Sequence, residues 1–450
     1  MTPPRILLIQ PPIEDFYTTS IRLYPLGLLY AARVLETMGC TVGVLDCLTP
    51  LRKKRIPVPQ CFHYLYPFIN DNSFPFRNYF RFGVSEDTIV EAIRAFQPDM
   101  VGISAQFTAY FETAERLAAL IKRNFRVPIF VGGNHATAFS EAIKQRTNAI
   151  DFVLPGQAES CLPSFFRTHY PHSPASPDAL DWTDIEPAHH LVPGNQYMMG
   201  RKHYVSLMAS RGCPYACDFC NAHMMWGKEI RYRTIDAVIR EMRWNYINKM
   251  VRIFNFEDDN LSYRRIWFSD FLQAVMGDPV LKGIELTAMN GMCYPTLDEE
   301  ILMSMKRSGF ARLNLSYVTQ NAALRQRYHR PGHGNTIEKI IATATSLGFF
   351  ITVYLVIGLP GQSFEETKGT IDYLLGLNVL VGPSVFYMPP GSPLYEHLDL
   401  PPETAKEWNL YRSSAFAVET RELSRAKLIE LFAYTRERNL GNRRTRRRTS

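Results

Sequence analysis

The sequence predicts an α/β protein in which a doubly wound, Rossmann-like parallel sheet precedes a partial (β/α)6 barrel and a C-terminal helical segment. Two observations predict it. Short β-branched runs alternate with amphipathic stretches twice along the chain, and a proline-rich stretch with few periodic apolar residues separates the two series. We therefore expect domains at 1–169 and 204–395, joined by a linker at 170–203 and followed by a helical region at 396–440 and a basic, disordered tail at 441–450.

The first series holds five strand and helix units. Each strand candidate is a short apolar run, and each helix candidate repeats apolar residues at helical spacing. Strands are expected at 5–10, 41–46, 100–105, 128–133 and 150–156, and helices at 25–38, 85–96, 110–124, 137–146 and 159–168. This alternation is typical of a doubly wound sheet, which binds ligands at the carboxyl ends of its strands.

Two stretches depart from this regular pattern. Residues 52–83 carry nine aromatic side chains among polar and proline residues, and they form either a lid over the ligand-binding edge or an insertion with its own aromatic cluster. Residues 170–200 are proline-rich and are interpreted as a linker. We expect the pair His189-His190 to lie on the surface of this linker rather than to bind a metal.

The second series predicts a partial (β/α) barrel, because six strand candidates alternate with five helix candidates. The strands are expected at 204–209, 251–257, 284–289, 312–317, 350–357 and 379–388, and the helices at 234–245, 263–276, 297–308, 336–347 and 364–375. The chemistry of such a barrel belongs at the carboxyl ends of its strands.

The composition excludes several classes of protein. With 46% hydrophobic and 21% charged residues, most of the chain is expected to fold. The net charge of +7 comes almost wholly from the arginine-rich residues 436–450, so the body is nearly neutral. No apolar run approaches the length of a membrane span, and residues 1–12 do not resemble a signal peptide. Eight cysteines are too few for a disulfide scaffold, so we expect a cytoplasmic protein.

Three of the eight cysteines fall within eight residues, just after the first strand of the second series: Cys213, Cys217 and Cys220. Thiolates this close on one loop can converge on iron or zinc. Three interpretations remain open from the residues alone. They are a structural zinc site completed by His223, three buried cysteines without a ligand, and a [4Fe-4S] cluster whose fourth iron lacks a protein ligand.

The spacing C-x3-C-x2-C on the loop after the first strand of a (β/α) barrel resembles the radical SAM superfamily. The resemblance implies that Cys213, Cys217 and Cys220 bind a [4Fe-4S] cluster and that S-adenosylmethionine (SAM) chelates its open iron. An electron from a donor such as flavodoxin or ferredoxin would then cleave SAM to a 5′-deoxyadenosyl radical, which abstracts hydrogen from a substrate. The cofactors carry the chemistry, and the protein orients them and excludes water.

Further positions match the family's SAM site. Residues 256–260 end the second barrel strand, where the family holds the methionine ammonium, and 358–361 resemble its glycine-rich turn near the adenine. Val318 departs from the family, which commonly carries Glu there, although Arg330 occupies a familiar place. Cys293 is expected to be a buried, inert thiol. The residues that the resemblance implies for SAM are Phe219, Glu257, Asp258, Asp259, Ser316, Thr319, Gly358, Pro360 and Gly361.

A doubly wound domain before a radical SAM barrel resembles the cobalamin-binding-domain class of the superfamily. The Asp-x-His-x-x-Gly loop of other cobalamin proteins is absent after the first strand, where Glu14-Asp15-Phe16 stands, so cobalamin would bind without that histidine. The resemblance implies methyl transfer to an unactivated carbon or phosphorus centre of a small metabolite or natural-product precursor. The residues implied for cobalamin are Ser104, Gln106, Gly132, Gly133, Asn134, His135, Gly156 and Gln157.

Several alternatives remain at this stage. A radical SAM enzyme could lack cobalamin or catalyse cyclisation or rearrangement, because a fold does not fix a reaction. A tRNA methylthiotransferase needs three more cluster cysteines, for which Cys40, Cys47, Cys61 and Cys161 are poorly placed. The arginine-rich tail could bind nucleic acid through phosphate contacts, although a solvated chain end is the commoner explanation. The substrate and the oligomeric state are not readable.

Overall fold

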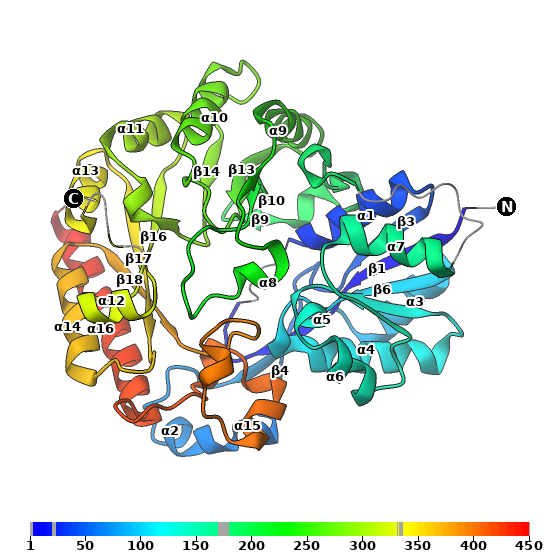
Figure 1. The fold of residues 1–450 in the computed structure, drawn as a ribbon, viewed down its shortest axis with the longest axis horizontal. Coiled ribbons are helices and arrows are strands. Elements are labelled where there is room, and N and C mark those ends of the chain that lie inside the picture. Colours follow the sequence, from blue (N-terminus) through cyan, green and yellow to red (C-terminus); the bar gives the residue numbers. More distant parts are fainter. Residues whose placement is uncertain (1–2, 20–23, 170–179, 331, 333–335, 450) are drawn as a thin grey trace.

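The computed structural model describes residues 3–19, 24–169, 180–330, 332 and 336–449. An N-terminal α/β domain lies beside a second domain built from two further sheets, which are parallel except for the edge strand β9 (Met198–Met199) (Figure 1). The carboxyl-terminal part of the chain returns to the N-terminal domain, so that the first and last hundred residues are in contact. The expected fold class is confirmed.

The N-terminal sheet has the strand order β3-β1-β6-β7-β8, and all its pairs are parallel. In chain order this is 2-1-3-4-5, the flavodoxin-like arrangement, whose ligand site lies where the order reverses, between β1 and β6. The strands are β1 (Arg5–Gln10), β3 (Thr41–Asp46), β6 (Met100–Ser104), β7 (Ile129–Gly132) and β8 (Phe152–Leu154). The expected strands are confirmed to within about two residues.

Helices cover this sheet as the apolar periodicity predicts (Figure 1). They are α1 (Leu26–Thr37), α3 (Glu86–Phe96), α4 (Phe111–Asn124), α5 (Asn134–Ala138), α6 (Ser140–Arg146) and α7 (Ala158–His169). One prediction is wrong in detail, because the single helix expected at 137–146 is divided. The backbone of Phe139, with φ −126°, leaves the helical region and separates α5 from α6.

The insertion at 52–83 builds a small antiparallel sheet, β2-β5-β4, together with the 3₁₀ helix η1 (Gln60–Leu65) and α2 (Tyr66–Asn70). Its strands are β2 (Ile13–Asp15), β4 (Lys53–Ile56) and β5 (Tyr79–Phe82). The ring of Phe16 meets those of Phe62 and Phe74 edge to face, and Phe74 meets Phe416 at 5.4 Å. Of the two alternatives, the structure therefore supports an aromatic cluster, and it joins the insertion to the C-terminal segment.

The linker is packed between the domains rather than loose. Residues 170–179 of it lie outside the described part of the chain; 180–200 contain η3 (Trp182–Asp184), η4 (His189–Leu191), η5 (Gly194–Gln196) and β9 (Met198–Met199). His189 is only 3% exposed, so the expectation that it lies on the surface is wrong. His190 is exposed, as expected, and pairs with Glu36 at 2.8 Å.

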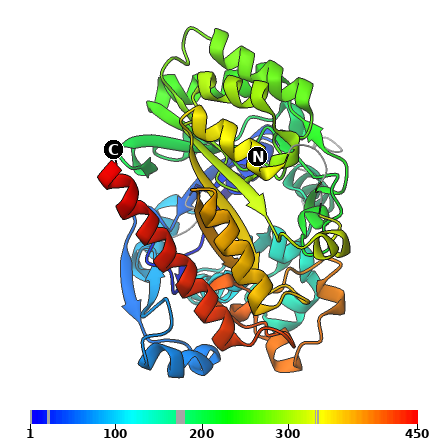
Figure 2. The same ribbon diagram turned by 90° about the vertical axis from the view of Figure 1, so that its left-hand side faces the viewer.

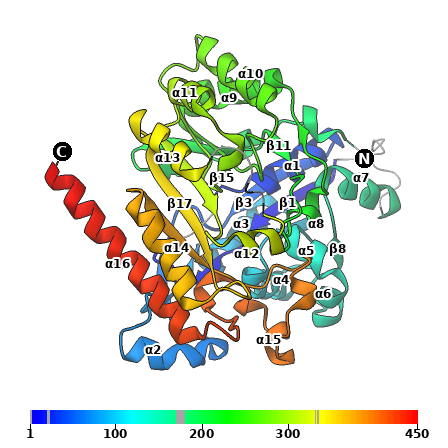
Figure 3. The ribbon, with the colours of Figure 1, turned by 60° about the vertical axis from the view of Figure 1, so that its left-hand side comes forward.

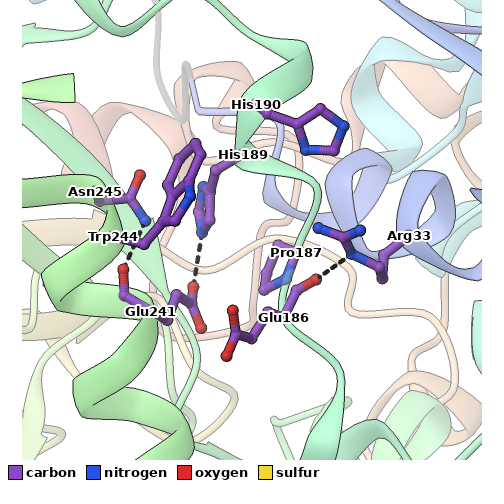
Figure 4. A pocket seen from close by; sticks show the side chains of 8 residues that line it. All are labelled: Arg33, Glu186, Pro187, His189, His190, Glu241, Trp244 and Asn245. Carbon is purple, nitrogen blue, oxygen red and sulfur yellow. Dashed lines mark hydrogen bonds and ion pairs between the residues drawn. The ribbon is translucent and has the colours of Figure 1, made fainter. Parts of the chain in front are cut away.

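His189 is buried because it joins three parts of the chain. Its Nε2 lies 2.7 Å from Glu241 of helix α9 (Ile235–Lys249), and its Nδ1 bonds the Tyr24 hydroxyl. A cavity of about 210 Å³ opens beside this network, between Arg33 of α1, the linker and α9 (Figure 4). Composition could not reveal this burial, because a buried imidazole needs partners that come from distant segments.

The second domain is a partial barrel made of two sheets, β14-β13-β10-β9 and β15-β16-β17-β18. A single parallel bridge between Leu286 and Phe310 connects them. The strands are β10 (Lys202–Leu207), β13 (Val251–Phe256), β14 (Glu285–Thr287), β15 (Met292–Cys293), β16 (Arg312–Tyr317), β17 (Phe350–Ile357) and β18 (Leu380–Val385). The six expected strands are confirmed, and the two-residue β15 is an addition.

Each of the five expected barrel helices is also present. They are α9 (Ile235–Lys249), α10 (Arg265–Gly277), α11 (Glu299–Ser308), α13 (Ile337–Ser346) and α14 (Phe364–Gly376). Their starts follow local capping chemistry: the side chains of Thr234, Asp298, Thr336 and Ser363 each accept a backbone N–H of the first turn. Because the six main strands pair in parallel, their carboxyl ends lie at one rim of the barrel.

The C-terminal region contains α15 (Pro402–Lys406), η8 (Trp408–Leu410), η9 (Ser413–Ala415) and the long α16 (Arg425–Thr449). Figure 2 shows α16 beside α14, and Figure 3 shows its end projecting from the body. The expectation of a disordered tail at 441–450 is wrong for the backbone, which stays helical to Thr449. Arginine is a good helix former, and no proline interrupts the run. Among the described residues, no helix is long and apolar enough to cross a membrane.

Candidate active site

The cysteine loop, residues 212–221, lies between the two-residue strand β11 (Ser210–Arg211) and the short helix α8 (Ala222–Trp226). β11 pairs antiparallel with β12 (Arg231–Tyr232), which fixes the start of the loop. Gly212 has φ +91°, and a Cβ there would lie 2.2 Å from the carbonyl oxygen of Glu229. Only glycine fits this turn, and the turn directs the chain toward the barrel rim.

The three thiols of the loop differ in exposure, and Cys220 is the exposed one. Cys217 is buried and Cys213 is half-buried. Burial raises the pKa of the Cys213 thiol above its ordinary value, so binding of a metal there requires the loss of a proton. Within the described residues, no three histidine, cysteine, aspartate or glutamate side chains stand as a preformed metal site. The donor set of three cysteines on one loop nevertheless fits an iron–sulfur cluster in its chemistry.

Two buried N–H donors lie against the cysteine sulfurs. Asn260 Nδ2 is 3.8 Å from Cys213 Sγ, and Arg330 Nη1 is 3.8 Å from Cys217 Sγ. Asn260 Oδ1 and Arg330 Nε are buried without a hydrogen-bond partner in the described part of the molecule. Donors of this kind stabilise thiolate ligands and tune a cluster's potential.

The zinc interpretation gains no support from His223. Its Nε2 lies 2.8 Å from the carbonyl oxygen of Cys213, to which it donates, and this bond closes the cysteine loop on itself. This bond occupies Nε2 alone and leaves Nδ1 able to bind a metal, so it does not by itself decide between zinc and iron.

The three acidic residues that follow β13, Glu257, Asp258 and Asp259, have different surroundings. Asp258 is buried, and its carboxylate accepts hydrogen bonds from the backbone of Ala209 and Ser210 at 3.1 and 2.5 Å. Burial raises the pKa of Asp258 to about 7. Glu257 accepts from Asn290 Nδ2 at 3.0 Å and is half-buried, whereas Asp259 is exposed at the rim. Asp258 therefore supports the loop that leads to Cys213, and its neighbours face the rim.

The expected residues of the later strands surround the same loop. Ser316 Oγ accepts from Arg330 at 2.5 Å, which links the end of β16 to the arginine beside Cys217. Thr319 is fully buried and its hydroxyl bonds Glu366. The backbone N–H of Gly358 is held by Gln362 Oε1 at 2.8 Å.

Two aromatic and backbone contacts tie the loop to these strand ends. Phe219 meets the ring of Tyr328 at 5.9 Å, and the Tyr328 hydroxyl bonds the carbonyl of Pro360. Gly361, with φ +91°, completes that turn. Of the expected SAM residues, Phe219, Ser316 and Pro360 are thus linked to the cysteine loop through Tyr328 and Arg330, whereas Thr319 and Asp258 are buried and bonded to other protein groups.

The segment after β18 closes the loop from the other side. Asn221 Nδ2 donates to the carbonyl of Pro390 at 3.2 Å, and the N–H of Leu394 donates to that of Asp218 at 2.8 Å. A Cβ on Gly391 would lie 2.7 Å from Met224 Sδ, so this close approach also requires glycine.

The expected cobalamin residues lie along the carboxyl edge of the N-terminal sheet. Ser104, Gly132, Gly133, Asn134, Gly156 and Gln157 are half-buried there, and Gln106 is exposed. Gly133 has φ +118°, and a Cβ would lie 3.0 Å from the carbonyl of Ala105. A glycine-rich edge with polar side chains suits a large polar ligand.

His135 lies beneath this edge rather than on it. The imidazole is fully buried, its Nδ1 is 3.1 Å from the Thr108 hydroxyl, and the rings of Phe111 and Trp408 lie 4.3 and 4.5 Å away. Burial lowers the pKa of His135 to about 3, so it is neutral. These contacts give it a packing role in the described structure.

Sequence reasoning missed several residues of the site. The sequence pattern does not identify Arg211 as part of the site, although this residue stands two positions before Cys213. Nor does it identify Glu159 and Asn260 as residues that contact the loop and its start. What marks these residues in the structure is a buried polar group that contacts a distant segment of the chain, and a sequence pattern does not reveal such burial.

Comparisons with known proteins assign both domains. A family profile described as "B12 binding domain" matches residues 77–166, and one described as "Radical SAM superfamily" matches residues 207–374. A cytidylyl-2-hydroxyethylphosphonate methyltransferase of Streptomyces wedmorensis is 25% identical, covering 82% of this chain and 76% of the relative. A bacteriochlorophyllide d C-12(1)-methyltransferase of Chlorobaculum tepidum is 23% identical, covering 77% of this chain and 75% of the relative.

Among solved structures, the radical S-adenosylmethionine methyltransferase TsrM from Kitasatospora setae, with cobalamin and a [4Fe-4S] cluster bound, superposes with a TM-score of 0.62 at 16% identity. The match covers 92% of this chain and 81% of that one. It shares the order of the two domains. Both profiles, the two-domain fold and the cysteine loop agree, and the chain belongs to the radical SAM superfamily, in the class that carries a B12-binding domain.

Proposed function

We propose that this enzyme is a cobalamin-dependent radical SAM methyltransferase that methylates a carbon or phosphorus centre of a small molecule. The observation that carries the proposal is the meeting of the two cofactor regions. Gln157, at the edge of the B12-binding domain, donates from Nε2 to the carbonyl of Met225 at 3.2 Å, five residues after Cys220. Methyl transfer needs both cofactors near one substrate, and this contact between the two regions supports such an arrangement.

In this proposal Cys213, Cys217 and Cys220 hold the [4Fe-4S] cluster, while Asn260 and Arg330 donate N–H groups toward its sulfur ligands. When bound, the cluster supplies the electron that cleaves SAM, and cobalamin supplies the methyl carrier. The protein's side chains orient these cofactors and exclude water from the site.

Several side chains fit recognition of SAM. Glu257 and Asp259 stand at the rim as acceptors for an ammonium group. Phe219 offers an aromatic face. The turn through Gly358, Pro360 and Gly361 is held in shape by Gln362 and Tyr328 and would border the adenine. Ser316 and Thr319 complete the set, with Ser316 acting through Arg330 and Thr319 through the turn it caps.

Cobalamin is assigned to the edge formed by Ser104, Gln106, Gly132, Gly133, Asn134, Gly156 and Gln157. His135 contributes packing beneath that edge and no cobalt ligand, because its ring is fully buried under Trp408. This agrees with binding that does not depend on a protein histidine.

The chemical class of the substrate follows from the relatives only in outline. Their names describe methylation of a cytidylyl-2-hydroxyethylphosphonate and of a bacteriochlorophyllide, and a TsrM structure was solved with a tryptophan substrate and a SAM analogue. All are small molecules, so we assign a small molecule here as well. A small flavodoxin or ferredoxin is the proposed electron donor.

The test is product analysis under anaerobic, reducing conditions with the cobalamin-loaded protein and SAM. Methyl transfer predicts 5′-deoxyadenosine together with S-adenosylhomocysteine, and the second product must depend on cobalamin. A Cys220→Ala variant is the control and should give no 5′-deoxyadenosine, because cleavage of SAM to that product depends on the cluster. Formation of 5′-deoxyadenosine without any S-adenosylhomocysteine would favour cyclisation or rearrangement instead.

A further inference from the structure

An arginine beside the cysteine loop is buried between the two domains. Arg211 occupies β11, two positions before Cys213, and only 3% of it is exposed. Its Nη2 lies 2.9 Å from Oε1 of Glu159, which is itself 4% exposed. Glu159 stands in the first turn of α7, where the helix dipole also favours a carboxylate. This ion pair runs from the barrel to the B12-binding domain.

A second residue of the same domain contacts both ends of the loop. Gln157 Oε1 accepts a hydrogen bond from Arg211 Nη1 at 3.3 Å, and Gln157 Nε2 donates to the carbonyl of Met225 at 3.2 Å. Arg211 precedes the first cysteine and Met225 follows the last. The segment Gly156-Gln157-Ala158-Glu159 therefore brackets the whole cysteine loop.

Three aromatic rings enclose the same guanidinium. The Cζ of Arg211 lies 4.4 Å from the ring of Trp182, 4.5 Å from that of Trp226 and 4.7 Å from that of Tyr30. These rings come from the linker, from α8 and from α1. The guanidinium of Arg211 is planar, lies among these three rings and pairs with Glu159, so its orientation is fixed. The ammonium of a lysine could not reproduce this arrangement.

A buried ion pair contributes little to net stability, because desolvation of the two charges offsets their attraction. Its value lies in the geometry that it imposes, since any displacement would leave a buried charge without its partner. Another buried hydrogen bond, from Tyr197 of the linker to Asp46 at 2.8 Å, joins the linker to the B12-binding domain.

We propose that Arg211 is a positioning residue: its ion pair with Glu159 fixes the cysteine loop against the B12-binding domain and so sets one separation between the cluster and the cobalamin. The part that concerns the separation between cluster and cobalamin rests on the proposed function, because this separation matters only if both cofactors are bound. It extends that function by naming the residues that align the two sites.

The primary experiment is pulsed EPR on protein loaded with the [4Fe-4S] cluster and cobalamin and then reduced, so that both centres carry an unpaired electron. Wild type should give one narrow cluster-to-cobalt distance distribution. Arg211→Met and Glu159→Gln should broaden or shift it, and Arg211→Lys should restore it only in part. Distributions equal to wild type in Arg211→Met and Glu159→Gln would overturn the proposal.

A second readout needs no cobalamin. In the cluster-loaded protein, amide hydrogen exchange in residues 213–226 should become about tenfold faster in both variants, while the strands of the B12-binding domain keep their protection. Unchanged exchange in the loop would contradict the role of Arg211. If wild type takes up no cobalamin, the proposed methyl transfer fails, and the exchange result still decides whether Arg211 anchors the loop.

The matched control is Tyr197→Phe, which removes a buried bond between the linker and the B12-binding domain. It should lower thermal stability without altering the cluster-to-cobalt distance or the exchange of the loop. A purely structural role for Arg211 predicts instead that its variants and Tyr197→Phe behave alike. Because Glu159→Gln conserves size and shape, it keeps the test available if Arg211→Met folds poorly.

Discussion

At the scale of single residues, the site depends on buried polar groups whose partners come from other segments. Asp258 illustrates this point, because its buried carboxylate already accepts hydrogen bonds from the backbone N–H groups of Ala209 and Ser210 and is therefore poorly available to a ligand. The sequence identifies Asp258 as one of a row of acids. Only the fold shows that it faces inward while Asp259 faces the rim.

The cysteine triad gives the first prediction. Cys217→Ala should abolish retention of a [4Fe-4S] cluster after anaerobic reconstitution, because two thiolates are too few to hold it. Iron and sulfide content and the visible absorption of the cluster measure the effect. Cys61→Ala, which changes a half-buried thiol in the insertion, should retain a full cluster. Equal iron in both variants would exclude Cys217 as a ligand.

His135 gives a prediction about pH. Burial lowers its pKa to about 3, so the unfolded chain binds a proton near pH 6 that the folded chain does not bind. Stability from this group is complete above about pH 6.5 and is lost as the pH falls. The loss between pH 6.5 and 5 should be about 1.5 kcal/mol.

The measurement is urea unfolding at both pH values in wild type and His135→Phe. The variant should lose less stability on acidification than wild type, whereas His397→Phe, at an exposed position, should follow wild type. A steeper acid dependence in His135→Phe would mean that His135 is not buried in its neutral form.

At the scale of elements, apolar periodicity predicts nearly every regular strand and helix of both domains, because burial of one face imposes that period. What it misses are short elements held by tertiary contacts. The 3₁₀ turns of the linker and the two-residue strands β11 and β15 have too few residues for a period. The break at Phe139 and the continuation of α16 to Thr449 are likewise invisible to it.

The turn into the cysteine loop gives a prediction at this scale. Gly212→Ala should destabilise the protein by about 2 kcal/mol or more and lower cluster occupancy, because its φ is positive and the added Cβ would clash with Glu229. Gly227→Ala is the matched control. Its φ is also positive, but the space around a Cβ there is open, so only the backbone strain applies. Thermal melts and iron content compare the two, and equal effects would argue against the clash.

At the scale of the whole molecule, the C-terminal segment locks onto the B12-binding domain. Arg412 is buried, pairs with Asp15 at 3.4 Å and donates to the carbonyls of Glu14 and Ala109. Ser414 adds a bond to the same Asp15 at 2.7 Å. The sequence alone predicts a C-terminal helical region but not its return to the first domain, because the contacts span about 400 residues.

Loss of this anchor should be costly. Arg412→Met leaves Asp15 buried without its cation, and we expect a loss of about 3 kcal/mol in the free energy of unfolding. Arg240→Met breaks an exposed pair with Glu186 and should change the same quantity by less than about 1 kcal/mol. Chemical denaturation followed by fluorescence makes the comparison. Similar small losses in both would show that the C-terminal segment is not an anchor.

The proposed chemistry requires that one chain holds an iron–sulfur cluster and cobalamin next to each other. Anaerobic reconstitution with iron, sulfide and hydroxocobalamin, followed by desalting and metal and cofactor analysis, tests it most directly. We predict about four irons, about four sulfides and about one cobalamin per chain. Protein that retains zinc in place of iron, or that releases all its cobalamin on desalting, would contradict the account.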